Sequence, residues 1–254
     1  MNVILEDILS FRNFLSKKFI FGNGIEIGAL HTPIKIYNQA DVRYVDRFGL
    51  DKLQLHYPEL SEEKLIEPDI IDNGELLSKF EKGSLDFIVA NHMLEHCENP
   101  LGSMRVHLQR LKKGGVCFYP ISDKRVSFDC DREKTEFDHL VHDDEVGPES
   151  SRTHHYEEWV EKVCKICFLE RGIEKFKWHE GLRNLLIDRH LESLTSEQLK
   201  VILDDMNYSI HFHVWDSDSF LEFIINARAH LENVFSIICC IHNQSEIIAI
   251  LKKI

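Results

Sequence analysis

The chain has 254 residues, 43% of them hydrophobic, and a formal net charge of −13 from 30 basic and 43 acidic side chains. This composition is typical of a globular protein with a buried core and excludes a disordered, fibrous or coiled-coil chain. The negative charge repels phosphodiester backbones, so we expect no nucleic-acid substrate.

The first 21 residues are apolar, but charged side chains interrupt them from Glu6 onward, which excludes an export signal. Their apolar positions recur at helical spacing and predict an amphipathic helix packed on the domain that follows. No run of about 18 apolar residues occurs, so we expect no membrane-spanning segment and no membrane partner. The 7 cysteines without an export signal indicate a reducing compartment, and we expect a cytoplasmic protein.

Short apolar runs alternate with helical or turn segments through the first half of the chain. This alternation is the pattern of βαβ units and predicts an α/β fold with a parallel sheet. Asn99 and Pro100 suit the cap and first turn of a helix that reaches Leu111. The expected strands are Gly24–Ile27, Val42–Val45, Pro68–Ile71, Leu85–Ala90 and Val116–Ile121.

The segment 124–210 is too long for an ordinary connection, and we interpret it as a helical substrate or lid insert. One helix is expected over residues 155–171, and another begins at Thr195, where Gln198 completes a capping box. Cys164 and Cys167 have the spacing of half a zinc site, but one pair cannot complete tetrahedral coordination, so we interpret them as ordinary helix residues.

After the insert, the pattern predicts a helix over residues 216–231 and a terminal hairpin with strands over 234–241 and 246–251. The chain is therefore divided into three parts. Residues 1–123 form the N-terminal helix and the cofactor-binding part, residues 124–210 form the insert, and residues 211–254 complete the domain.

The segment Gly24-Ile-Glu-Ile-Gly28 carries the strongest local signal for a ligand site. A glycine directly after a buried parallel strand lets the backbone turn sharply and approach a ligand. Asp46 ends the second strand, where a carboxylate can accept hydrogen bonds from both hydroxyls of a ribose. The Gly22-x-Gly24 pair precedes its strand and no G-x-G-x-x-G is present, which disfavours a nicotinamide cofactor.

The succession of Glu26-Ile-Gly28, Asp46, Asp72-Asn-Gly74 and Ala90-Asn-His-Met-Leu-Glu-His96 resembles the ordered motifs of class I S-adenosylmethionine-dependent methyltransferases. The resemblance covers about residues 20–122 and 211–254. It implies a doubly wound, Rossmann-like α/β sheet with a reversed last strand, and S-adenosylmethionine as cofactor. The glycine loop departs from the family pattern, because His31 and Pro33 stand in place of the second and third glycines. Thr32 and Pro33 suit the start of a short helix.

In that family, the glycine loop receives the methionine part, the acid after strand two holds the ribose, and the acid after strand three meets the adenine amino group. The backbone after strand four helps to hold the methionine amine. Carried over position by position, the resemblance implicates the cofactor-binding residues Glu26, Gly28, Asp46, Asp72 and Asn91, with Arg47, Asn73 and His92 as neighbours lining the pocket.

A finer resemblance links the chain to small methyltransferases encoded with bacterial surface-polysaccharide genes. It implies methyl transfer to a small-molecule acceptor, a hydroxyl of a sugar, phosphorylated or phosphoramidate-type precursor in capsule modification. The segments that carry it are Val42–Arg47, Leu94–His96, Asp131-Arg-x-x-Thr135-x-x-x-His139-Leu and Ile210–Trp215.

Methyl transfer to a hydroxyl needs a base that removes the proton as attack develops. His139, His211 and His213 are the candidate catalytic residues, and His211 and His213 alternate in a strand-like stretch that would place them on one face. A purely structural role for each histidine stays open. Arg132 and Arg152 are candidates for gripping an anionic acceptor.

Acidic residues and histidines of the insert offer an alternative, a divalent-cation site. We interpret this stretch as a solvated acidic loop and expect no metal. The residues concerned are Asp129, Asp131, Asp138, His139, His142, Asp143 and Asp144.

Two other functions fit the same scaffold, because a fold alone does not fix a function. An NAD(P)-dependent oxidoreductase would bind its dinucleotide at the same edge of the sheet. A non-catalytic module would bind the cofactor without turnover.

Overall fold

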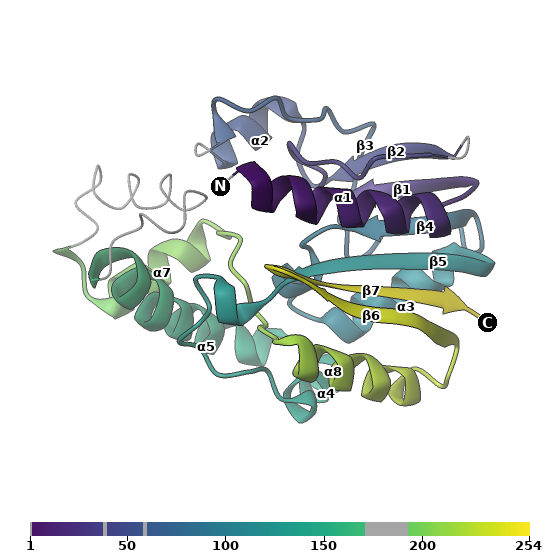
Figure 1. Ribbon diagram of the computed structural model, residues 1–254. Coiled ribbons are helices and arrows are strands. Elements are labelled where there is room, and N and C mark those ends of the chain that lie inside the picture. The colour runs from purple at the N-terminus through teal and green to yellow at the C-terminus, as the bar shows by residue number, and fades with distance from the viewer. Residues whose placement is uncertain (1, 38–39, 58–59, 171–192) are drawn as a thin grey trace.

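A computed structural model describes residues 2–37, 40–57, 60–170 and 193–254 (Figure 1). Its centre is a seven-stranded sheet in the order β3-β2-β1-β4-β5-β7-β6. Only β7 runs antiparallel to its two neighbours, so the expected Rossmann-like sheet with a reversed strand is confirmed. The strands are β1 Asn23–Ile27, β2 Asp41–Asp46, β3 Ile70–Ile71, β4 Leu85–Ala90, β5 Leu111–Ser122, β6 Phe235–Asn243 and β7 Glu246–Lys253.

The central strand β4 is buried on both faces, as its continuous apolar sequence predicts. Phe87 and Val89 belong to the cluster on one face, and Ile88 and Ala90 to the cluster on the other. This alternation follows from the two-residue period of a strand. Both faces of the sheet must therefore be covered by other elements.

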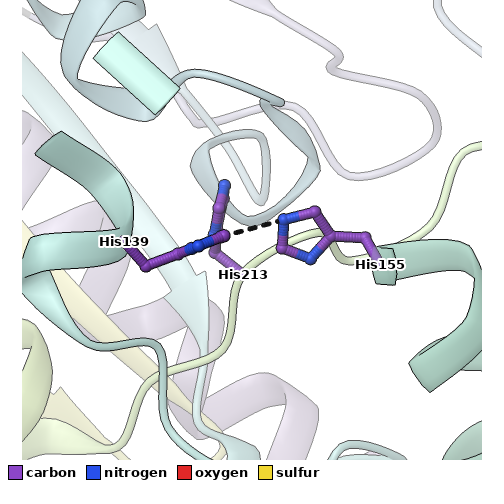
Figure 2. Close-up of side chains that lie close together, drawn as sticks. All are labelled: His139, His155 and His213. Atoms are coloured by element: carbon purple, nitrogen blue, oxygen red, sulfur yellow. Dashed lines mark hydrogen bonds between the residues drawn. The ribbon is translucent and has the colours of Figure 1, made fainter. Parts of the chain in front are cut away.

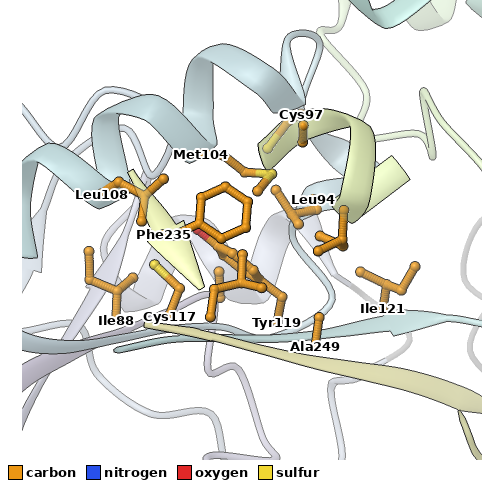
Figure 3. Close-up of a cluster of buried hydrophobic side chains, with 14 of the residues drawn as sticks. Ile88, Leu94, Cys97, Met104, Leu108, Cys117, Tyr119, Ile121, Phe235 and Ala249 are labelled. Atoms are coloured by element: carbon orange, nitrogen blue, oxygen red, sulfur yellow. The ribbon is translucent and has the colours of Figure 1, made fainter. Parts of the chain in front are cut away.

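Helix α1 (Asn2–Phe19) covers one face, where its Leu15 packs with Phe118 and Ile250 of the sheet (Figure 1). Helices α3 (Pro100–Arg110) and α8 (Ser217–His230) cover the other face. Figure 3 shows part of that second core, where side chains of α3 meet those of β4, β5 and β7. Asn99 caps α3 by accepting the amide of Gly102 at 2.7 Å, as its sequence position predicts.

The loop after β1 differs from the sequence expectation. No helix begins at Thr32 and Pro33, and residues 32–37 are irregular. The reason is a tertiary contact, because the Ile34 amide donates to the buried carboxylate of Glu26 instead of to a helical carbonyl. Between β2 and β3, the short helix α2 (Leu50–His56) follows the Asp46 edge.

The insert has a helical core of its own, which includes Tyr156, Trp159, Leu203 and Phe212. Thr195 caps α7 with Gln198 in the predicted capping box. The acidic stretch expected to be a loop contains α4, and the helix expected over 155–171 is two segments, a regular α5 and a π-helical η4. The described helical segments are η3 Lys124–Val126, α4 Phe137–Val146, α5 Glu149–Trp159, η4 Val160–Glu170 and α7 Ser196–Asp205.

Cys164 and Cys167 lie within the π-helical segment, as expected for helix residues, and the Cys164 side chain is buried. The last residue of the expected helix, Arg171, lies outside the described residues. Within the described part of the chain, no helix has the length and apolar character needed to cross a membrane.

Candidate functional site

The carboxyl ends of β1, β2 and β3 are joined at one edge of the sheet. The Gly28 amide donates to the Val45 carbonyl at 3.0 Å, and the Asp72 amide donates to the Asp46 carbonyl at 3.0 Å. Asn91, directly after β4, reaches the Thr32 carbonyl of the glycine loop with its side-chain nitrogen at 3.4 Å. The structure thus brings the motifs after four strands to the same edge.

Gly28 provides the sharp turn after β1. Its φ is +67°, a left-handed conformation that favours glycine, and no heavy atom lies within 4 Å of the position that a Cβ would take. Glu26, in β1, holds the same loop through a hydrogen bond. It is fully buried, and both carboxylate oxygens accept the Ile34 amide, at 3.0 and 3.1 Å.

This burial raises the pKa of Glu26 to about 8, although the Ile34 amide and the charge of Arg12 oppose the rise. A carboxyl group with such a pKa is largely protonated at neutral pH. Glu26 is therefore a positioning residue that fixes the loop through the backbone of Ile34.

Asp46 is partly exposed at the end of β2. Burial raises its pKa, while the amides of Arg47 and Phe48 donate to it and lower the pKa. The Arg47 guanidinium lies 2.7 Å from His56 and over the Phe48 ring, and its charge also lowers the pKa of Asp46. The Asp46 residue is partly exposed, and a carboxylate has acceptor positions beyond those that the two amides use.

Asp72 and Asn73 stabilise the turn after β3. Asp72 accepts the Asn73 amide at 2.9 Å, the Ser78 hydroxyl at 2.8 Å and the Lys79 amide at 2.8 Å. Asn73 accepts the amide of Glu75 at 2.7 Å. Three of the roughly four acceptor positions of a carboxylate are thus occupied by the Asp72 turn itself.

Asn91 is buried, and its side-chain oxygen has no hydrogen-bond partner among the described residues. Buried polar atoms are rarely left unpaired, so this oxygen indicates a missing ligand. Next to it, His92 has a φ of +47°. Its Nδ1 lies 3.1 Å from the Ser122 hydroxyl and 3.2 Å from Glu95, and its Nε2 lies 3.3 Å from Glu246.

Sequence reasoning missed a buried ion pair that joins both ends of the chain beside His92. The Nε of Arg12 in α1 donates to both carboxylate oxygens of Glu246, the first residue of β7, at 2.9 and 2.8 Å. Burial favours the neutral form of Glu246, but His92 and Arg12 lower its pKa to about 2. The carboxylates of Glu246 and Glu95 in turn raise the pKa of His92 against the effect of burial.

His211 and His213 do not share one face, because residues 211–214 are irregular and not a strand. His211 Nδ1 lies 2.6 Å from a carboxylate oxygen of Asp129, and Arg132 donates to the other Asp129 oxygen at 2.9 Å. Burial favours neutral Asp129, but the charges of His211 and Arg132 lower its pKa to about 2.

His213 lies instead with His139 of α4 and His155 of α5 (Figure 2). The Nε2 atoms of His139 and His155 are 3.0 Å apart. Burial lowers the pKa of His155 to about 3, helped by the charge of His139, and lowers the pKa of His213 well below its usual value. Both buried imidazoles are therefore neutral.

The two arginine candidates of the insert are both engaged in ion pairs. Arg132 pairs with Asp129 and Glu158, and Arg152 pairs with Glu98 and Asp204, so neither is a ready grip for an anionic acceptor.

Contacts at two places fasten the insert and the residues just after it to this edge of the sheet. The segment before α8 binds the residues after β4, because His96 Nδ1 lies 2.8 Å from the Ile210 carbonyl and the His213 amide donates to Glu95 at 3.2 Å. On the β2 side, the ring of Tyr208 lies 6.1 Å from that of His56. Residues 208–213 therefore span from the β2 edge to the β4 edge.

The family model described as a methyltransferase domain matches residues 24–212, which is more than half of the chain. The chain belongs to the methyltransferase domain family. It is a class I, S-adenosylmethionine-dependent methyltransferase. This assignment disfavours the oxidoreductase and the non-catalytic module.

Solved methyltransferase structures are similar to the chain at low sequence identity. One is an enzyme from Aquifex aeolicus, which is 8% identical over 98% of this chain and 93% of that chain, with a TM-score of 0.48. Another is a possible histamine N-methyltransferase from Thermotoga maritima, which is 14% identical over 99% of this chain and 88% of that chain, with a TM-score of 0.44. The CurJ carbon methyltransferase is 13% identical, with a TM-score of 0.43. The match covers 92% of this chain but only 49% of the CurJ chain. No curated protein matches the sequence.

The edge of this methyltransferase fits its cofactor. Open space beside the Gly28 backbone, the partly exposed Asp46 and an unpaired Asn91 oxygen lie at neighbouring strand ends. A carboxylate suits ribose hydroxyls, and an amide oxygen suits the ammonium group of the methionine part.

Proposed function

We propose that the enzyme methylates a hydroxyl of a small polar acceptor and that His211 is the general base. When bound, S-adenosylmethionine supplies the electrophilic methyl group. The observation that carries this proposal is the attachment of the His211 segment to Glu95 and His96 in the short helix η2 (Leu94–His96), which follows β4 after three residues. His211 thereby lies beside the strand end that receives the methionine part in the family.

The surroundings of His211 suit a base. When Nδ1 donates to Asp129, the lone pair is on Nε2, which can accept a proton. The ionised Asp129 stabilises the imidazolium that forms, and Arg132 holds Asp129 in place. The ring of His96 packs edge-on against His211 at 4.5 Å and limits its rotation.

For the cofactor, we assign Asp46 to the ribose hydroxyls, with the Gly28 loop and Asn91 around the methionine part. Asp72 and Asn73 border the adenine through the turn that they hold. Arg47 and His92 line the two sides of this pocket. Glu26 contributes by fixing the loop.

We infer that the acceptor is a sugar, phosphorylated or phosphoramidate-type precursor in capsule or other surface-polysaccharide modification. The motif resemblance supports this class. The Arg47 side chain supports it too, because its cationic guanidinium lies 2.7 Å from His56, whose ring lies 6.1 Å from the ring of Tyr208 in the insert. We assign acceptor binding to the insert, residues 124–210, and place the reaction in the cytoplasm.

The test is release of S-adenosylhomocysteine with a panel of acceptors: sugar phosphates, nucleotide sugars, phosphoramidate-bearing sugars and primary amines. We expect turnover with an anionic sugar hydroxyl, and loss of turnover in His211→Gln but not in His154→Gln, an exposed histidine of the same insert. Turnover with the amines alone, or an unchanged His211→Gln enzyme, would contradict the proposal.

A further inference from the structure

Three histidines from separate segments meet at one place, two from the insert and one from the segment that follows it (Figure 2). His139 comes from α4, His155 from α5, and His213 from the irregular segment before α8. One ring nitrogen of each lies within 4.8 Å of the others. We propose that these three histidines bind a divalent transition-metal ion, best matched by Zn²⁺, and that Asp143 supplies the fourth ligand.

The distances suit a tetrahedral ion. Ligand nitrogens on zinc at about 2.1 Å lie roughly 3.4 Å apart, and the nitrogen separations here run from 3.0 Å to within 4.8 Å. The carboxylate oxygen Oδ2 of Asp143 lies 3.2 Å from His139 Nε2. Three imidazoles and one carboxylate form a nitrogen-rich set that suits zinc better than magnesium or calcium.

His213 gives an independent indication of a ligand. Its side chain is fully buried, and its Nδ1 has no hydrogen-bond partner among the described residues. Its Nε2 lies 3.4 Å from the Glu98 carbonyl, a second contact that fixes the ring as metal-bound histidines are fixed. Simple packing leaves this buried nitrogen unexplained, because the hydrogen bond in the cluster joins only His139 and His155.

The site differs from the acidic cation site that the sequence suggested. The Asp129 carboxylate is already bound by Arg132 and His211. The Asp144 carboxylate is already bound by Arg105 and His230. Of the acidic candidates, Asp143 is fully buried, and it also accepts the Ser151 hydroxyl, which orients the carboxylate. An ion here would join α4, α5 and the segment before α8, and would leave His211 as the base.

Zinc content and affinity test this proposal without any acceptor or cofactor. Tag-free full-length protein is freed of metal with a chelator and titrated with ZnCl₂ by calorimetry, and metal content is measured by mass spectrometry. We expect one equivalent of zinc in the wild-type protein, and an affinity lower by at least about tenfold in His139→Gln and His213→Gln. His154→Gln and Asp138→Asn, exposed controls on α5 and α4, should bind as the wild type.

His139 is partly exposed, so His139→Gln should remain folded, and circular dichroism checks this. Co²⁺ provides a second readout. We expect the cobalt-loaded protein to show the absorption of a tetrahedral site without thiolate charge-transfer bands. This tetrahedral absorption should be absent in His139→Gln. No stoichiometric zinc, binding unchanged in His139→Gln, or a cysteine-type spectrum would overturn it.

Discussion

The Nδ1 atom of His211 lies 2.6 Å from a carboxylate oxygen of Asp129, and both side chains are buried. Such a pair keeps an imidazole in one tautomer and one orientation. Removing the base should lower the rate of the chemical step by about 10²–10⁴-fold.

We therefore expect His211→Gln and Asp129→Asn to lower kcat with the identified acceptor, while the Kd for S-adenosylmethionine from calorimetry stays unchanged. His154→Gln is the matched control. A parallel loss of cofactor affinity in both variants would assign the pair to folding and not to proton transfer.

Asp46→Ala should weaken cofactor binding. Each hydrogen bond from a ribose hydroxyl to a carboxylate contributes about 1.5–3 kcal/mol, so the loss is on the order of ten- to a hundredfold in Kd or more. Asp41 is an exposed aspartate at the start of the same strand, and Asp41→Ala should bind normally. Equal affinities of the two variants, measured by calorimetry, would remove Asp46 from the site.

The buried Arg12–Glu246 pair should be sensitive to removal of one partner. Arg12→Met leaves a buried carboxylate without its ion-pair partner, and we expect a loss of about 3–5 kcal/mol in unfolding free energy by urea denaturation. Asp86→Asn, which breaks the exposed Lys112–Asp86 pair, should cost less than about 1 kcal/mol. Similar losses of unfolding free energy in Arg12→Met and Asp86→Asn would contradict the stabilising role of the buried ion pair.

The same pair sets an acid dependence of stability. The folded-state pKa of Glu246 is about 2, below the usual 4.5, so its contribution is present above pH 4.5 and is lost as pH falls from 4.5 toward 2. The difference in Tm between the wild type and Glu246→Gln should narrow over that range. Glu222→Gln, an exposed change on α8, should give a constant difference.

The contribution of Glu26 to stability should depend on pH in the opposite direction from that of Glu246. Its folded-state pKa is raised to about 8, so its contribution to stability is present below pH 4.5 and is lost as pH rises from 4.5 through about 8. Glu26→Gln keeps a neutral acceptor for the Ile34 amide, and it should gain stability relative to the wild type from pH 5 to pH 9. Thermal melts across this range, with exposed Glu81→Gln as control, measure the effect. A constant difference would mean that Glu26 is ionised throughout.

Local patterns predicted the sheet's strands in chain order, but β5 begins at Leu111, where a helix was expected to end, and not at Val116. The apolar run of β4 gave its bounds, and the Thr195 capping box gave the start of α7. The glycine and polar residues after β1, β2, β3 and β4 meet at one edge, because parallel strands end on the same side.

Contacts between distant segments were beyond sequence reasoning. Nothing in the spacing of His155 links it to His139 and His213, which only the packing of α5 against α4 brings together. The sequence of helix α4 resembles a solvated loop, because its many charges hide a weak apolar stripe around Leu140. The ion pair of Arg12 and Glu246 joins residues 234 positions apart.

The reversed direction of β7 has a consequence for the order of assembly during translation. Because β7 runs backward, its first residue, Glu246, comes to the edge where β1 and β4 end, beside His92. The motifs after β1 to β4 leave the ribosome more than a hundred residues earlier, but the carboxylate that anchors His92 and Arg12 arrives only with the last strand. A ribosome-bound chain stalled before Glu246 should therefore hold an incomplete cofactor edge.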